Sequence, residues 1–266
     1  MPESITPYRN EVPFQAGEKE MLVQYVLHLA DNALILGHRN SEWTGHGPVL
    51  EQDIAISNIA LDLIGQARNF YQYAAVLQDS GHTEDSLAYF RDAPAFRNCL
   101  LVEQPRGDWA YTIARQFFFS AYQFFFFNQL QQSSDNQLSA IAVKSLKEVN
   151  YHLRCSSEWV IRLGDGTMES KQRMEIALHN MVPFTEELLT PAPYEETLKN
   201  LHIAVDLPSI RAAFLEKLRS VLGEATLLQP VVAMQSGGKV GNHTAHLERL
   251  LFEMQMLQRT YPGCNW

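Results

Sequence analysis

The run Gln116–Phe127, QFFFSAYQFFFF, most constrains how this chain can fold. It lies in a segment that we predict to be helical from Trp109 to about Gln132, with Asp108 placed to cap its first turn. Around such a helix the aromatic side chains would point in nearly every direction, whereas a surface helix has one polar face. We therefore predict that this helix is central and is covered by other elements on most of its sides.

Apolar residues recur at helical spacing through most of the remaining sequence, and no convincing strand alternation is present. The helices predicted from this pattern span about 17–39, 48–78, 83–102 with an interruption at Pro94, 134–164, 167–189, 208–228 and 243–259. Residues 190–207 hold two prolines and are predicted to be irregular. We expect an all-α fold, a ferritin-like helical bundle with additional C-terminal helices, formed by residues 17–266 as a single domain after a flexible tail at 1–16.

Charge and hydropathy exclude several classes of function. The net charge is −9 and no basic stripe is present, so we expect no nucleic-acid partner. No stretch of about 18 apolar residues occurs, and the N-terminus does not resemble a signal peptide, so no membrane partner is expected. The three cysteines form no CxxC pattern and are expected to be reduced thiols. Together these features predict a cytoplasmic protein.

A ferritin-like bundle that binds two metal ions needs Glu from two helices and a Glu-x-x-His motif from each of two others. No Glu in this chain has His three positions later. The corresponding places read Asp62-Leu-Ile-Gly65 and Glu148-Val-Asn-Tyr151, and His152 lies about 100° around the helix from the required position. The central aromatic helix has no carboxylate between positions 108 and 135. We therefore expect no catalytic residue, no metal ligand and no cofactor-binding residue in this chain.

The carboxylates that remain near these places are interpreted as a vestigial polar cluster. Its expected members are Glu42, Asp62, Glu148, Tyr151 and His152. Buried charges must be paired, because an unpaired one costs several kcal/mol. An alternative is an enzyme with an atypical site, in which Glu42, Asp62, Glu148 and His152 bind one metal ion.

Two further features lie near the C-terminus. His243 and His246 are three residues apart on a predicted helix, but no third ligand is evident, so we interpret them as surface or capping histidines. The segment SGGKVGNHT, which includes Lys239, resembles a phosphate-binding loop but lacks GxxxxGK[ST] and follows no strand.

Four blocks carry a resemblance to a known family. They read LADNALILGHRNSEWTGHGPVLEQDIAISNIALDLIGQAR, LLVEQPRGDWAYTIARQFFFSAYQ, LKEVNYHLRCSSEWVIRLGDGT and GNHTAHLERLLFEMQMLQRTYPG. Over about residues 20–265, the chain resembles the family of non-catalytic C subunits of bacterial phenylacetyl-CoA ring 1,2-epoxidases, which act in aerobic phenylacetate catabolism.

The resemblance implies a non-catalytic structural subunit of an oxygenase complex. In that family, a ferritin-like catalytic subunit holds the di-iron centre, further subunits connect the complex, and a reductase supplies electrons from NADPH. The non-catalytic subunit binds this catalytic partner and is a diverged copy without metal. This implies no cofactor in the present chain, di-iron in its partner, and a possible homo-oligomer when the chain is isolated. The substrate class that the resemblance implies also raises a second alternative function, an acyl-CoA-binding accessory module that uses Lys239 and the neighbouring Gly-rich loop. We expect the interface on the first two helices, near Trp43 and Tyr71.

Overall fold

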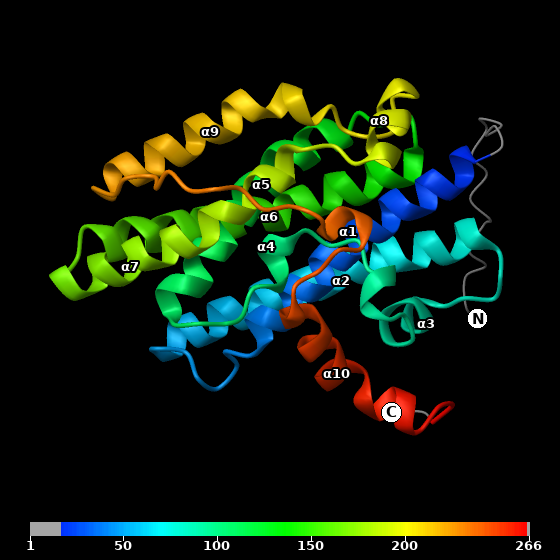
Figure 1. The fold of residues 1–266 in the computed structure, drawn as a ribbon, viewed down its shortest axis with the longest axis horizontal. Coiled ribbons are helices and arrows are strands. Elements are labelled where there is room, and N and C mark those ends of the chain that lie inside the picture. The colour runs from blue at the N-terminus through cyan, green and yellow to red at the C-terminus, as the bar shows by residue number, and fades with distance from the viewer. Residues whose placement is uncertain (1–16, 265–266) are drawn as a thin grey trace.

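The computed structural model describes residues 17–264, and within them the chain forms helices and short 3₁₀ turns with no strand (Figure 1). The helices are α1 (Glu18–Ser41), α2 (Leu50–Gln78), α3 (Glu84–Tyr89), α4 (Leu100–Glu103), α5 (Trp109–Leu130), α6 (Asn136–Gly164), α7 (Met168–Met181), α8 (Pro193–Asn200), α9 (Leu207–Glu224) and α10 (Ala245–Thr260). The all-α prediction is confirmed. The tail predicted at 1–16 lies outside the described residues.

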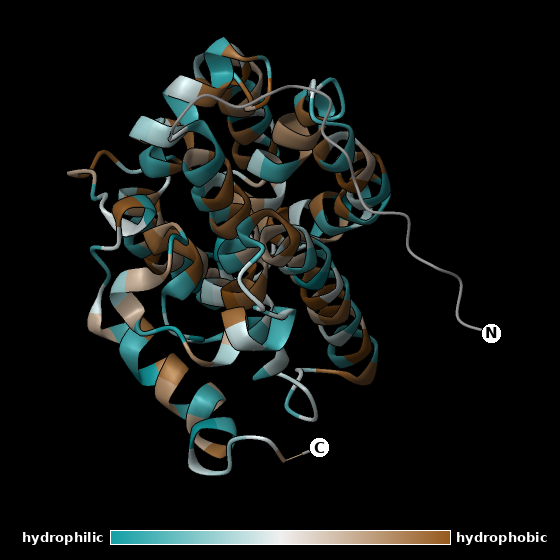
Figure 2. Cartoon of the chain, turned by 90° about the vertical axis from the view of Figure 1, so that its right-hand side faces the viewer, coloured by the Kyte–Doolittle hydropathy of each residue, from teal (hydrophilic) through white to brown (hydrophobic). Residues whose placement is uncertain are grey.

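Two long helix pairs form the bundle. Helix α1 packs along α2, and α5 packs along α6, while α2 and α6 also touch each other. Helices α7 and α9 cover α5 and α6 on a further side (Figure 1). Hydrophobic residues gather where the helices face one another (Figure 2). The chain therefore has a continuous core between the helix pairs.

Helix α5 is central, as its aromatic run predicted. Phe117, Phe118 and Phe119 are fully buried, and so are Phe126 and Phe127. Burying side chains of this size contributes about 1.5–3 kcal/mol each to the hydrophobic driving force. The helix begins where expected, because the Asp108 carboxylate accepts a hydrogen bond from the Tyr111 amide at 2.9 Å. No helix within residues 17–264 is both long and apolar enough to cross a lipid bilayer.

Three predicted elements differ from the structure, and proline explains each difference. The interruption predicted at Pro94 is confirmed, since Pro94 lies in a 3₁₀ turn between α3 and α4, but these two helices cover much less of 83–102 than predicted. The helix predicted to reach residue 189 ends at Met181, because Pro183 cannot donate to the α-helical ladder. The region predicted to be irregular contains α8, which uses Pro193 in its first turn. Pro48, in contrast, precedes α2 by two residues.

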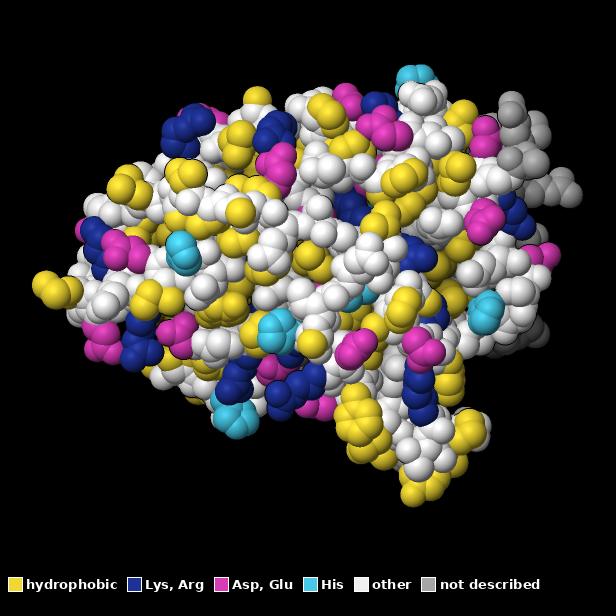
Figure 3. All heavy atoms as spheres, viewed as in Figure 1, with side chains coloured by type: hydrophobic (Ala, Val, Ile, Leu, Met, Phe, Trp, Pro, Cys, Tyr) yellow, Lys and Arg dark blue, Asp and Glu magenta, His cyan; other side chains and the backbone are white. Residues whose placement is uncertain are grey.

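The C-terminal region crosses the bundle before α10 projects from it (Figure 1). The Gln255 side chain donates to the carbonyls of Ala88 and Arg91 at 3.1 and 3.0 Å, and Arg259 pairs with Asp92 at 2.8 Å. Yellow apolar side chains gather on this projecting helix in Figure 3. The exposed apolar residues of α10 include Phe252, Met256 and Leu257, and Tyr261, which follows the helix, is also exposed.

Candidate functional site

Five polar side chains meet between α2, α5 and α6, and we call them the bundle cluster: Asp62, Gln66, Gln123, Glu148 and His152. His152 Nε2 lies 2.9 Å from the Asp62 carboxylate, and the Gln66 amide donates to Glu148 at 2.9 Å. The Gln123 amide donates to Gln66 at 3.3 Å. Helices α2 and α6 each supply two members that are four residues apart, and this spacing places both side chains on the same face of the helix. The bundle cluster therefore links α2 to both partner helices.

The structure brings together three of the five residues expected in the vestigial cluster, namely Asp62, Glu148 and His152. Tyr151 lies beside them on the surface, with its ring edge against the His152 ring at a centroid distance of 6.3 Å. Glu42 follows the last residue of α1, and its carboxylate pairs with Arg39 at 2.8 Å. Glu42 thus belongs to a separate ion pair at the end of α1 and not to the bundle cluster.

A di-iron centre does not fit the side chains of the bundle cluster. Two of its members, Gln66 and Gln123, are neutral amides, whereas the di-iron sites of this fold use carboxylates and histidines. Asp62 and Glu148 already accept hydrogen bonds from His152 and Gln66. Within residues 17–264, no three His, Cys, Asp or Glu side chains are grouped so that they could hold a metal ion. The bundle cluster therefore lacks the ligand set for metal-dependent chemistry.

Buried amide side chains also link the end of α1 to α5. The Asn40 amide donates to Gln116 Oε1 at 2.7 Å, and Gln116 in turn donates to Ser120 at 2.8 Å. All three residues are fully buried. A chain of neutral hydrogen bonds satisfies most of these buried polar atoms without a charge, which avoids the large cost of an unpaired buried ion.

A second set of buried groups, which we call the C-terminal network, joins the loops after α7 to the bundle: Glu103, Glu187, Glu195, Lys239 and His243. Lys239 Nζ pairs with Glu195 at 2.9 Å and donates to the Thr190 carbonyl at 3.0 Å. Burial lowers the pKa of Lys239, but the facing Glu195 carboxylate outweighs this effect and the net pKa is raised. Lys239 is therefore a charged group inside the protein, not a free surface cation.

The burial of Lys239 bears on the acyl-CoA alternative. Its side chain is 5% exposed, so its ammonium group does not face a ligand in solvent. The neighbouring backbone is also engaged, because Glu187 accepts from the amides of Gly237 and Lys239 and from Leu100. The loop that resembled a phosphate site thus presents its amides to an internal carboxylate.

His243 and His246 do not lie together. His246 is exposed, whereas the His243 side chain is 3% exposed and lies between Glu103 at 2.8 Å and the Phe96 carbonyl at 3.1 Å. Both ring nitrogens face acceptors, so only the doubly protonated ring satisfies both. Burial lowers the pKa of His243, but the Glu103 hydrogen bond and charge outweigh it and raise the pKa overall. The surface interpretation was correct for His246 and wrong for His243.

A third buried group surrounds Asp31 on α1. Its carboxylate accepts from the Tyr71 hydroxyl at 2.5 Å and the Arg97 amide at 2.8 Å, and it pairs with Arg91. The Arg91 guanidinium stacks 4.2 Å above the Phe96 ring. Tyr71 is therefore a core residue, not an exposed interface aromatic. The sequence signal that could have revealed this group was Asp31 itself, a carboxylate among apolar residues of α1.

Trp43, the other aromatic expected at an interface, is also engaged inside the chain. Its ring meets the Trp109 ring edge-on at a centroid distance of 5.1 Å, and its indole NH donates to Thr112 at 2.8 Å. The Arg106 guanidinium covers its face at 4.9 Å. Trp43 thus fixes the end of α1 against α5, and its ring is not a free surface for a partner protein.

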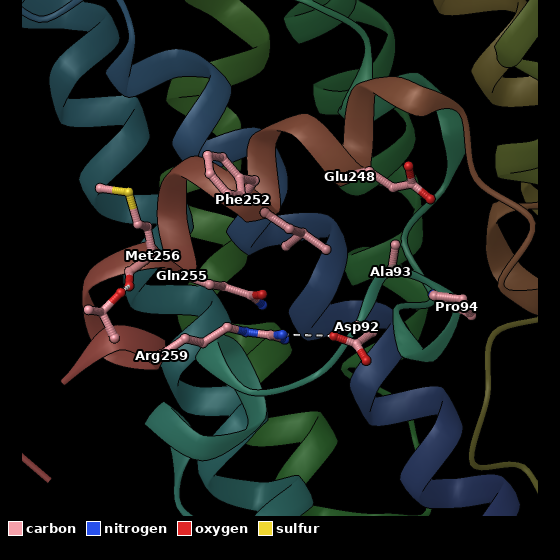
Figure 4. Close-up of a pocket in the computed structure, with 10 residues that line it drawn as sticks. Asp92, Ala93, Pro94, Glu248, Phe252, Gln255, Met256 and Arg259 are labelled. Atoms are coloured by element: carbon pink, nitrogen blue, oxygen red, sulfur yellow. Dashed lines mark hydrogen bonds and ion pairs between the residues drawn. The ribbon is translucent and has the colours of Figure 1, made fainter. Parts of the chain in front are cut away.

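An open pocket of about 440 Å³ lies between α10 and the segment before α4 (Figure 4). Phe252 and Met256 line it from α10, and the Asp92–Arg259 ion pair closes one side. Its charged groups are paired or exposed, and no nucleophile with an adjacent base lines it. The pocket is a surface groove with an apolar lining and offers no catalytic arrangement.

Comparison with known proteins places the chain in a family. The family model described as "Phenylacetic acid catabolic protein" matches residues 9–266. The C subunit of the 1,2-phenylacetyl-CoA epoxidase of Escherichia coli (strain K12) is 48% identical over 246 residues, which cover 92% of this chain and 99% of that protein. The near-complete coverage on both sides means that the bundle and the C-terminal region are matched together. The chain therefore belongs to the phenylacetic acid catabolic protein family.

Proposed function

We propose that this chain is the metal-free structural subunit of a phenylacetyl-CoA 1,2-epoxidase in aerobic phenylacetate catabolism. It binds and stabilises the catalytic subunit, which holds the di-iron centre, and it works in the cytoplasm. The extent of the match to the E. coli protein supports the assignment to this complex. The complex as a whole consumes O₂ and NADPH, and this chain contributes no reacting group.

The observation that carries the metal-free role is the internal pairing of the bundle cluster. Asp62 is matched by His152 and Glu148 is matched by Gln66, at 2.9 Å in both cases. A metal site would need these carboxylates to face a common point with further carboxylate ligands, whereas Gln66 and Gln123 supply amides. The cluster is thereby suited to fixing the spacing of α2, α5 and α6, which gives the catalytic subunit a rigid surface to bind.

The test is to purify this chain, the catalytic subunit, and the two together. We expect stoichiometric iron only in preparations that contain the catalytic subunit, with both chains eluting as one complex on size exclusion. With the remaining subunits and reductase added, epoxidation of phenylacetyl-CoA should require both chains. Two irons per isolated chain, or full epoxidation without this chain, would overturn the proposal.

Paired variants separate a structural cluster from an atypical metal site. Asp62→Asn and Glu148→Gln keep the size of each side chain and one acceptor oxygen for His152 or Gln66. We expect the complex that carries either variant to epoxidise within about twofold of the wild-type rate, because lost surface or half-buried charges typically cost little. A loss of activity of about a hundredfold with normal complex formation would favour the metal-enzyme alternative.

A further inference from the structure

The two carboxylate oxygens of Glu195, on α8, have unequal surroundings. Oε2 accepts hydrogen bonds from the Ala192 amide at 2.7 Å and from Lys239 Nζ at 2.9 Å. Oε1 is also buried, yet within residues 17–264 no donor lies within hydrogen-bond distance of it. A buried polar atom in a folded protein is nearly always hydrogen-bonded, and a carboxylate oxygen is the most costly kind to leave without a donor.

The side chain that faces Glu195 Oε1 presents a second acceptor. His28, on α1, is fully buried, and its Nε2 lies 3.9 Å from Oε1, which is too far for a direct hydrogen bond. His28 Nδ1 lies 2.7 Å from the Arg97 carbonyl and must donate to it, because a carbonyl only accepts. In the neutral ring Nε2 is therefore a lone-pair acceptor. Asn32 Nδ2 is 3.3 Å from both ring nitrogens, so it does not lie along the Nε2 lone pair.

Protonation does not turn this contact into a direct ion pair at neutral pH. Burial lowers the pKa of His28 to about 4, because the opposing effect of Glu195 is smaller and Lys239 acts in the same direction as burial. Burial raises the pKa of Glu195, but the Lys239 charge outweighs this effect and lowers the pKa overall. A neutral imidazole and an ionised carboxylate thus face each other, and both need a donor.

A tyrosine hydroxyl in the same buried region also lacks a protein partner. Tyr122, on α5, is 1% exposed, and its hydroxyl makes no hydrogen bond to any described residue. Burial raises its pKa, and among the charged groups the Glu195 carboxylate raises it most. Since such an effect requires proximity, the hydroxyl lies near the carboxylate and can donate to a group beside it.

We propose that one buried water molecule bridges Glu195 Oε1 and His28 Nε2 and accepts a hydrogen bond from the Tyr122 hydroxyl. Water has the required chemistry, because it donates two hydrogen bonds and accepts others. Bonds of about 2.8 Å from one oxygen atom to each acceptor fit their 3.9 Å separation. The three partners are also about the number that a buried water has. A cation is disfavoured, because Lys239 already pairs with Glu195.

The bridging water extends the C-terminal network to the centre of the bundle. His28 belongs to α1, Tyr122 to α5 and Glu195 to α8, and Lys239 connects the same carboxylate to the Gly-rich loop. Helices α1 and α8 pack against each other, so the water lies at a contact between helices that are distant in sequence. Its hydrogen bonds satisfy three polar atoms that would otherwise oppose this packing.

The direct test is a high-resolution crystal structure of the full chain at neutral pH. We expect a solvent peak within hydrogen-bond distance of Glu195 Oε1, His28 Nε2 and the Tyr122 hydroxyl. Absence of this peak, or a direct hydrogen bond between any two of the three side chains, would overturn the proposal. Nitrogen NMR of His28 at pH 7 should show a neutral ring with its proton on Nδ1. A doubly protonated ring would also count against it, since that ring needs no bridging donor.

A pair of tyrosine variants tests the third contact of the water. Tyr122→Phe should raise the equilibrium constant for unfolding by about two- to tenfold, because a hydrogen bond to the water is lost. Tyr194→Phe is the matched comparison, since its buried hydroxyl donates to the Lys239 carbonyl at 3.2 Å and its loss should have an effect of similar size. The crystal structure of Tyr194→Phe should keep the water. An unchanged or lowered unfolding constant in Tyr122→Phe would show that its hydroxyl has no partner and would refute the three-contact site.

Discussion

His243 is held between two acceptors, and its charge therefore matters for stability. The folded protein binds the proton more tightly than the unfolded chain does, since the pKa of His243 is raised. This contribution is fully present below the unfolded pKa of about 6.5 and is lost as pH rises through the raised folded pKa. We expect the difference in unfolding free energy between wild type and His243→Gln to be about 1.5–3 kcal/mol at about pH 5.5 and smaller at about pH 8.5.

Denaturant unfolding of both proteins across this pH range measures that difference. Other titrating groups are common to the two proteins, so their contributions largely cancel. His28 is an example, because burial lowers its pKa to about 4. Its contribution to the unfolding free energy is lost as pH falls from about 6.5 toward that value, and this loss is the same in both proteins. A difference that grows with pH would contradict the charged state of His243.

Lys239 illustrates what a single sequence does not reveal about individual residues. Its Gly-rich surroundings favour a mobile surface loop, yet its ammonium group is buried against Glu195, 44 residues earlier in the chain. Local patterns carry no information about such long-range pairs. Gln66 and Gln123 were missed for a different reason. The metal sites of this fold use carboxylates and histidines, so a sequence search for such ligands does not detect glutamines. These two side chains nevertheless hold the bundle cluster together.

At the level of helices, the sequence predicted the long elements well because their signals are local. Asp108 and Asp135 cap α5 and α6 by accepting amide hydrogen bonds, and apolar spacing defines the buried faces. The segments around α3, α4 and α8 were predicted less well. Their paths depend on distant partners, such as the Arg97 amide, which bonds to Asp31. Proline positions predicted breaks, but not the directions that the chain takes after them.

Two glycines within helices, Gly65 on α2 and Gly37 on α1, should respond in opposite ways to substitution by alanine. Gly65→Ala should raise the unfolding free energy of the isolated chain by about 0.5–1 kcal/mol, because alanine favours the helix and its Cβ meets open space. Gly37→Ala on α1 is the matched comparison. There a Cβ would lie 3.0 Å from Ile64 Cγ1 and 3.3 Å from the Ala60 carbonyl, so we expect destabilisation. Denaturant titration measures the change in unfolding free energy of each variant, which should be an increase for Gly65→Ala and a decrease for Gly37→Ala. Changes in the same direction would contradict this account.

At the scale of the whole molecule, the C-terminal network makes the fold depend on residues near the C-terminus. Deletion of residues 230–266 removes the cations that pair with Glu195 and Glu103, and two of the three amides that donate to Glu187. Breaking a buried ion pair by removing one partner costs about 3–5 kcal/mol, so the loss of two pairs is comparable to a typical stability of about 5–15 kcal/mol. We expect this truncation to lose its cooperative thermal transition, as followed by circular dichroism.

Deletion of residues 245–266 provides the control, since it removes α10 but keeps Lys239 and His243. This shorter truncation should retain a cooperative transition at a lower temperature, because it removes the apolar contacts of α10, its ties to the α3 region and the Arg39–His246 hydrogen bond, while the buried charges keep their partners. Loss of cooperativity in both truncations would show that α10, and not the buried charges, sets the stability of the bundle.

The separation of Glu195 from Lys239 also has a consequence for synthesis of the chain. At a translation rate of about 5–20 residues per second, the 44 residues between them take about 2–9 s to polymerise. During that interval a nascent chain that closes its core would trap Glu195 without its cation. Ribosome-bound chains should therefore wait in an open, chaperone-accessible state until the Gly-rich loop emerges, and stop codons that fall before this loop should produce aggregation rather than partly working protein.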